Sequence, residues 1–124
     1  MSKYRNNLPI LSNEIYLTDG GLETSLIFNE GMDLPEFAAF TLLTNDTGIK
    51  KLESYYEKYI LIAKKYNFGF ILESPTWRAS SKWGELLSYS NDDLLKINQN
   101  AIVLLEKLRN KFETKTTKMV ISAC

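Results

Sequence analysis

Hydrophobic and polar residues follow two patterns along the chain, short apolar runs and longer segments with helical spacing. The apolar runs at residues 15–18, 68–72 and 119–124 are predicted strands. The run at 68–72 has no polar alternation, which is typical of a parallel strand covered on both faces. The order strand, helix, strand, helix, strand indicates two right-handed crossover units, so the predicted fold class is α/β with parallel strands.

Two amphipathic helices are predicted between these strands. In residues 48–66 the apolar positions recur at spacings of three and four, and they are Ile49, Leu52, Tyr56, Tyr59, Ile60 and Ala63. The tyrosines of this helix are assigned to core and surface. The second helix opens at Ser90, where Asp93 completes a capping box, and extends to about Phe112. Its apolar stripe consists of Leu94, Ile97, Ala101, Leu104 and Leu108.

The remaining segments are less regular. We predict a short helix near residues 22–29, a loop with embedded aromatic residues over 76–89, and a polar linker over 113–117. Residues 34–43 are apolar but follow no clear period, and their pattern favours no one structure.

The composition is that of one small globular domain, since 44% of the 124 residues are hydrophobic and 24% are charged. The 15 basic and 15 acidic residues are interspersed, which argues against nucleic acid or a membrane surface as a partner. No run approaches the ~18 apolar residues of a membrane span, and the N-terminal residues lack the apolar core of a signal peptide. We therefore expect a cytoplasmic protein.

Histidine and cysteine usage limits the chemistry. The chain has no histidine, so it cannot build a Ser-His-Asp or Cys-His site by itself. The single cysteine, Cys124, cannot form an internal disulfide and is far short of the three or four ligands of a zinc site. We expect Cys124 to be a small buried apolar residue.

Two polar clusters follow the first two predicted strands. Asp19, Gly20 and Gly21 come directly after the first, and Glu73 to Thr76 end the second. The carboxyl ends of parallel strands share one rim, where ligands gather. Adjacent glycines let the backbone approach a ligand, and an aspartate can accept a hydrogen bond from an ammonium group. This combination suits a small zwitterion such as an amino acid.

Each of these features also has a simpler interpretation. From spacing alone Asp-Gly-Gly is more typical of a tight turn, and Glu73 could cap the following segment. Trp77 and Trp83 could wall a pocket or pack against a helix. No phosphate-binding glycine motif is present.

Three segments together resemble a known family. The stretches LTDGGLET (residues 17–24), GFILESPTWRA (69–79) and VIS (120–122) are similar, in that order, to the N-terminal part of the homocysteine S-methyltransferase family. The resemblance implies a (β/α)8 TIM barrel, of which this chain would be the N-terminal portion, about three β/α units. It also implies transfer of a methyl group from a donor to the thiol of homocysteine, which gives methionine.

The resemblance assigns substrate-binding roles to five residues. Asp19, Gly20 and Gly21 would hold the amino acid, and Glu73 and Thr76 match the E-T-N-T-type sequence of many members. The two residues between Glu73 and Thr76 depart from that sequence.

The resemblance also implies a zinc ion that activates the thiol, held by cysteines of later strands, and Cys124 is at none of those positions. We therefore expect residues 1–124 to form a partial homocysteine-binding domain, truncated after the third strand and inactive alone, with no catalytic residue and no metal ligand. A complementing chain or self-association would then complete it. The alternatives are a non-catalytic association module and an independent small α/β binding domain.

Overall fold

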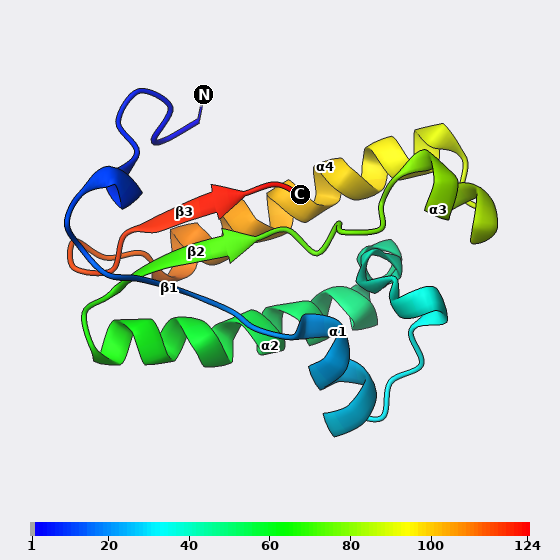
Figure 1. The fold of residues 1–124 in the computed structure, drawn as a ribbon, viewed down its shortest axis with the longest axis horizontal. Coiled ribbons are helices and arrows are strands. Elements are labelled where there is room, and N and C mark those ends of the chain that lie inside the picture. The colour runs from blue at the N-terminus through cyan, green and yellow to red at the C-terminus, as the bar shows by residue number, and fades with distance from the viewer. Residues whose placement is uncertain (1) are drawn as a thin grey trace.

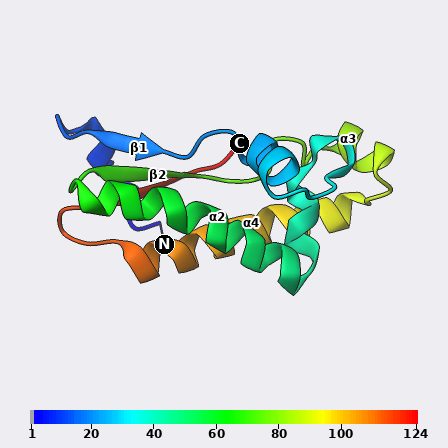
Figure 2. The ribbon, with the colours of Figure 1, turned by 90° about the horizontal axis from the view of Figure 1, so that it is seen from below.

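A computed structural model describes residues 2–124 and confirms the predicted α/β class with parallel strands. Strands β1 (Tyr16–Thr18), β2 (Gly69–Glu73) and β3 (Met119–Ser122) form one open sheet in the order β1-β2-β3. Helices α2 (Asp46–Lys65) and α4 (Asn91–Phe112) connect them, and both lie on the same face of the sheet (Figures 1 and 2). In each crossover the chain passes from a strand through shorter helical elements into a long helix, and from there into the next strand, so the predicted order of strands and long helices is observed.

The strand register aligns the apolar centres of the strands. Leu17 pairs with Phe70, which in turn pairs with Met119. Phe70, Leu72 and Met119 are completely buried. Burial of the central strand explains why its sequence shows no polar alternation.

Helix α2 begins two residues before the predicted start because Asn45 caps it. The Asn45 side chain accepts a hydrogen bond from the backbone N–H of Gly48 at 2.8 Å. Gly48 is packed so tightly that an added Cβ would lie 2.2 Å from the carbonyl oxygen of Leu42. The helix is followed by Asn67, which has a left-handed backbone with a φ of 56°.

Helix α4 begins as predicted. Ser90 and Asp93 form the reciprocal capping box, with each side chain bonded to the backbone N–H of the other residue. The predicted apolar stripe is confirmed, because all five of its residues are buried.

No helix within residues 2–124 combines the length and the apolar character needed to cross a bilayer.

Shorter elements extend beyond the carboxyl ends of the strands. The predicted helix near 22–29 is a helical segment in two parts, α1 (Leu22–Thr24) and a π-helical turn (Ser25–Asn29). Residues 34–43, for which the sequence favoured no structure, contain the 3₁₀ turn Pro35–Phe37 and most of a second one, Ala39–Thr44.

The prediction of a loop over residues 76–89 is partly wrong, because it contains the helix α3 (Ser81–Leu86). Only Gly84 in this helix is fully buried, and it packs so closely that an added Cβ would lie 2.5 Å from Leu94 Cδ1. A helix of under two turns with one buried position has too few residues for a period to be read.

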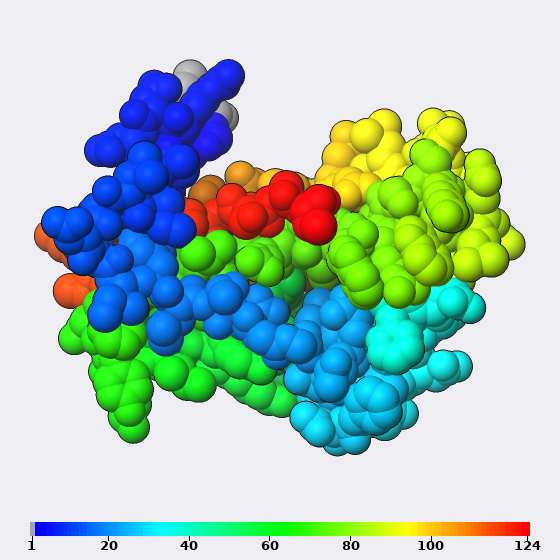
Figure 3. Space-filling view, in the orientation of Figure 1, coloured from blue at the N-terminus to red at the C-terminus, as the bar shows by residue number. Residues whose placement is uncertain are grey.

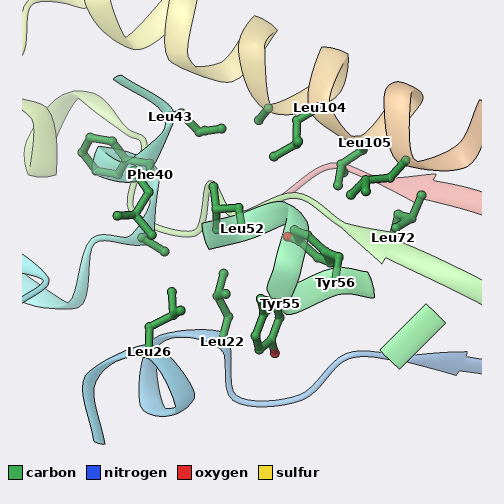
Figure 4. Packing of buried hydrophobic residues seen from close by; sticks show 14 of the residues in the cluster. Leu22, Leu26, Phe40, Leu43, Leu52, Tyr55, Tyr56, Leu72, Leu104 and Leu105 are labelled. Carbon is green, nitrogen blue, oxygen red and sulfur yellow. The ribbon is translucent and has the colours of Figure 1, made fainter. Parts of the chain in front are cut away.

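The hydrophobic core lies between the sheet, the two long helices and these shorter elements (Figure 4). Leu22 and Leu26 approach it from α1 and the π-helical turn, and Phe40 and Leu43 from the second 3₁₀ turn. The segments on either side of the polar strand ends are therefore fixed by packing, which positions the site described next.

Candidate functional site

A cavity of about 440 Å³ lies at the carboxyl ends of the three strands. Its walls come from the segment after β1, from the end of β2 and the loop that follows it, from the end of β3, and from α2. The lining residues are Asp19, Gly21, Leu22, Glu23, Tyr56, Glu73, Ser74, Pro75, Trp77, Ser122, Ala123 and Cys124. In the space-filling view the hollow lies beside the red end of the chain, above the blue segment that follows β1 (Figure 3).

Asp19 stands at the rim of this cavity and is held by a tyrosine of α2. The Tyr55 hydroxyl lies 2.9 Å from Asp19 Oδ2, and the Thr18 hydroxyl lies 3.5 Å from Oδ1. Partial burial raises the pKa of the Asp19 carboxyl, and the hydrogen bond from Tyr55 opposes that rise.

The two glycines after Asp19 have different roles in the structure. Gly21 lines the cavity and has a left-handed backbone (φ 63°, ψ 50°) at the start of α1. Gly20 does not line the cavity, and its carbonyl oxygen accepts hydrogen bonds from Tyr55 and Tyr59, both at 3.0 Å. Gly20 therefore anchors the turn, and Gly21 forms part of the wall.

Glu73 lines the cavity from the end of β2, and its exposed side chain has no hydrogen bond or ion pair within residues 2–124. Its backbone carbonyl accepts a hydrogen bond from Tyr56 at 2.6 Å. The cap position of the next helix is taken by Ser80. Glu73 is thus free to receive a ligand, and it does not cap the following helix.

Thr76 lies behind the rim and does not line the cavity. It is buried, and its hydroxyl contacts Ser74 Oγ at 2.6 Å and the carbonyl oxygen of Cys124 at 3.2 Å. The backbone N–H of Cys124 donates in turn to Ser74 Oγ at 3.2 Å. Thr76 therefore ties the segments after β2 and β3 together, so its predicted place on the rim is corrected to a supporting place behind it.

The cavity is electrostatically negative. Asp19, Glu23 and Glu73 line it, and among the described residues 2–124 no lysine or arginine does. Burial, followed by the charges of these three carboxylates, raises the pKa of the Tyr56 hydroxyl far above its ordinary value. A ligand that carries a positive group is therefore favoured over an anion.

The tyrosines of α2 are the site residues that sequence reasoning missed. Tyr55 and Tyr56 are buried and Tyr59 is partly buried, yet their hydroxyls reach the turn after β1 (Tyr55 and Tyr59) and the last residue of β2 (Tyr56). One signal was available, since a buried phenol needs a hydrogen-bond partner. The identity of that partner depends on the folded arrangement and cannot be read from helical spacing.

The two tryptophans differ in their positions. Trp77 is 59% exposed and lines the cavity, whereas Trp83 does not line it. The guanidinium of Arg78 lies between them, 4.5 Å from the Trp77 ring centroid and 3.9 Å from that of Trp83. Arg78 also donates a hydrogen bond to the carbonyl oxygen of Glu36. The contact with Arg78 therefore fixes the orientation of the Trp77 ring, which forms part of the cavity wall.

The residues present do not fit the zinc site that the resemblance implies. Among residues 2–124, no group of three or more histidine, cysteine, aspartate or glutamate side chains is placed to hold a metal ion. Cys124 is exposed at the cavity, contrary to the expected burial, because β3 ends at Ser122 and the chain leaves the sheet there.

The arrangement can therefore bind and orient a small cationic or zwitterionic ligand through carboxylates on two neighbouring strand ends.

Comparison of the chain with protein-family models, curated proteins and solved structures found no match.

Proposed function

We propose that this chain forms the amino-acid-binding part of a homocysteine S-methyltransferase-like protein, as the first three β/α units of a (β/α)8 barrel. The observation that carries the proposal is the meeting of Asp19 and Glu73 at one cavity, at the carboxyl ends of adjacent parallel strands. Ligands of parallel α/β proteins gather at this end of the sheet.

The ligand class follows from charge and size. Three carboxylates without a lining cation favour an ammonium group, and Asp19 and Glu73 offer acceptors for it. A cavity of about 440 Å³ lies within the usual range for small-molecule sites. Homocysteine carries the required ammonium group, and the motif order of the chain favours it over other amino acids.

The proposal assigns to this chain the binding and orientation of the amino acid and no step of methyl transfer. Asp19 and Glu73 receive the amine, Gly21 shapes the backbone beside it, and Trp77 excludes water from one side. Zinc, when bound in a family member, activates the thiol, but residues 2–124 supply no set of ligands for it.

The test is calorimetric titration of the purified 124-residue chain with L-homocysteine. We expect binding that weakens about tenfold or more in both Asp19→Asn and Glu73→Gln, because each loses a charge-assisted hydrogen bond. Asp33→Asn removes an exposed acid that does not line the cavity and should bind like the unaltered chain. The amine-free analogue 4-sulfanylbutanoate should not bind. Unchanged affinity in both cavity variants would refute the proposal.

The open sheet favours a second candidate, an association module without catalysis. Within residues 2–124, β1 and β3 each pair on one side only, so each has a free edge on which another chain could add a strand. Sedimentation would separate the candidates, since a concentration-independent monomer that binds homocysteine supports the first and contradicts the second.

A further inference from the structure

Tyr55 of α2 is buried beneath the turn that follows β1, with only 2% of its surface exposed. Its hydroxyl lies 2.9 Å from Asp19 Oδ2 and 3.0 Å from the carbonyl oxygen of Gly20. In the close-up the ring of Tyr55 reaches toward the segment between β1 and α1 (Figure 4). The ring makes an edge contact with Tyr56 at a centroid distance of 5.5 Å and a tilted contact with Tyr59 at 5.1 Å.

The hydroxyl of Tyr55 has one proton and two acceptors within reach. Tyr59 also donates to the Gly20 carbonyl oxygen, at 3.0 Å, so that oxygen is satisfied without Tyr55. An ionised carboxylate has only acceptor sites and forms the stronger bond with a phenol. The proton of Tyr55 is therefore directed to Asp19 whenever Asp19 is ionised.

The other side chains around Asp19 are acids or donate elsewhere, so the hydrogen bond from Tyr55 matters for the ionisation of Asp19. Glu23 of α1 and Glu73 of β2 share its cavity as acids, and Tyr56 of α2 is a phenol that donates elsewhere, to the carbonyl oxygen of Glu73. The Thr18 hydroxyl is at 3.5 Å, beyond the usual range for such a bond. Burial raises the pKa of the Asp19 carboxyl, and the hydrogen bond from Tyr55 is the largest effect that opposes this rise, ahead of a backbone hydrogen bond at Asp19 itself.

We propose that Tyr55 is a positioning residue for the amine site, which keeps the Asp19 carboxylate ionised and fixed through Oδ2 while Oδ1 remains open to the ammonium group of the ligand. This role rests on the proposed function for the identity of the ligand, but the effect on Asp19 is a property of the ligand-free chain. Tyr59 has the matching role for the backbone, since it holds Gly20 and makes no bond to the carboxylate.

The primary test is an NMR titration of the ¹³C-labelled Asp19 carboxyl in the ligand-free chain. Tyr55→Phe keeps the ring and removes the donor, and we expect it to raise the titration midpoint of Asp19 by about one pH unit, a tenfold change in proton affinity. Tyr66→Phe, which removes an exposed hydroxyl just beyond the end of α2, is the control and should leave the midpoint within ~0.3 pH units. An unchanged midpoint in Tyr55→Phe, or equal changes in both variants, would overturn the inference.

A second variant keeps the test decisive if Tyr55→Phe does not fold. Replacing Tyr55 by 3-fluorotyrosine preserves the packing and makes the hydroxyl a stronger donor, so the midpoint should fall. No fall would also overturn the inference.

Titration with L-homocysteine at several pH values distinguishes this inference from the proposed function. If both hold, homocysteine affinity falls off at a higher pH in Tyr55→Phe than in the unaltered chain as the solution is acidified. The reason is that the amine needs an ionised Asp19. If the Asp19 midpoint shifts but homocysteine does not bind at any pH, the positioning role stands and the proposed function fails.

Discussion

Asp19 lies in the candidate binding site, and its ionised form lowers the stability of the folded chain. Its pKa is raised by burial, so the folded chain holds the proton more tightly than the unfolded chain does. For an acid with this direction of shift, stability is greatest at low pH and declines as the pH rises through the folded-state pKa. Ionised Asp19 is thus a source of instability at neutral pH, as is common where function and packing compete.

We predict that Asp19→Asn increases the free energy of unfolding at pH 7, because the amide needs no desolvation of a charge and can still accept from Tyr55. The difference from the unaltered chain should vanish below about pH 3, about one unit under the ordinary aspartate pKa, where Asp19 is protonated in both states. Urea denaturation at the two pH values measures this, with Asp33→Asn as the control. A loss of stability at pH 7 would show that the bond from Tyr55 outweighs the burial of charge.

The two glycines of the turn should differ in their tolerance of a side chain. Gly21 has a positive φ, so Gly21→Ala should cost about 1–2 kcal/mol of unfolding free energy. At Gly20 an added Cβ meets nothing within 4 Å and φ lies outside the left-handed region, so Gly20→Ala should change stability by less than about 0.5 kcal/mol. Thermal or urea unfolding of the pair gives the comparison, and equal losses would contradict the described turn.

At the scale of elements, α3 and α4 offer a matched test of capping. Ser90 accepts a hydrogen bond from the backbone N–H of Asp93, whereas Ser80, at the equivalent position of α3, makes no side-chain capping bond. Ser90→Ala should therefore cost about 1 kcal/mol, and Ser80→Ala only a few tenths. Chemical denaturation of both variants measures the difference. A similar loss in the two would mean that the capping bond of Ser90 contributes little.

The elements also show what the sequence could predict. Long amphipathic helices and buried strands were predicted because their periods extend over many residues, as with the stripe from Leu94 to Leu108. The placement of Asp19 and Glu73 at one rim followed from the rule that parallel strands end at the same edge. Local pattern and topology were sufficient for both.

Other features depend on tertiary contacts that the local sequence does not encode. Thr76 is turned inward by bonds to Ser74 and Cys124, the second of which belongs to a distant part of the chain. Tyr55 lies outside the predicted apolar stripe of its helix, and its contact with Asp19 becomes visible only when the turn after β1 is seen beside it. Such side-chain partners are set by the packing of whole elements and become visible only in the structure.

At the scale of the whole molecule, the sheet has one protected strand and two edges. β2 is paired on both sides, whereas β1 and β3, within residues 2–124, are paired on one side each. We predict that the amides of Phe70 to Leu72 exchange with solvent about tenfold or more slowly than the amides of β1. Native-state hydrogen exchange measures this. Equal protection in β1 and β2 would show that the free edge of β1 is covered in solution, for example by a second copy of the chain.

The cavity has a practical consequence because its walls come from three strand ends that meet only when both crossovers are complete. A compound that fits there binds the folded chain and has no counterpart site in the unfolded one. Such a compound raises the unfolding free energy by about 2.7 kcal/mol at a concentration of 100 times its Kd. The melting temperature of the chain can therefore serve as a screen, in which a panel of amines and amino acids is ranked without any prior choice of ligand.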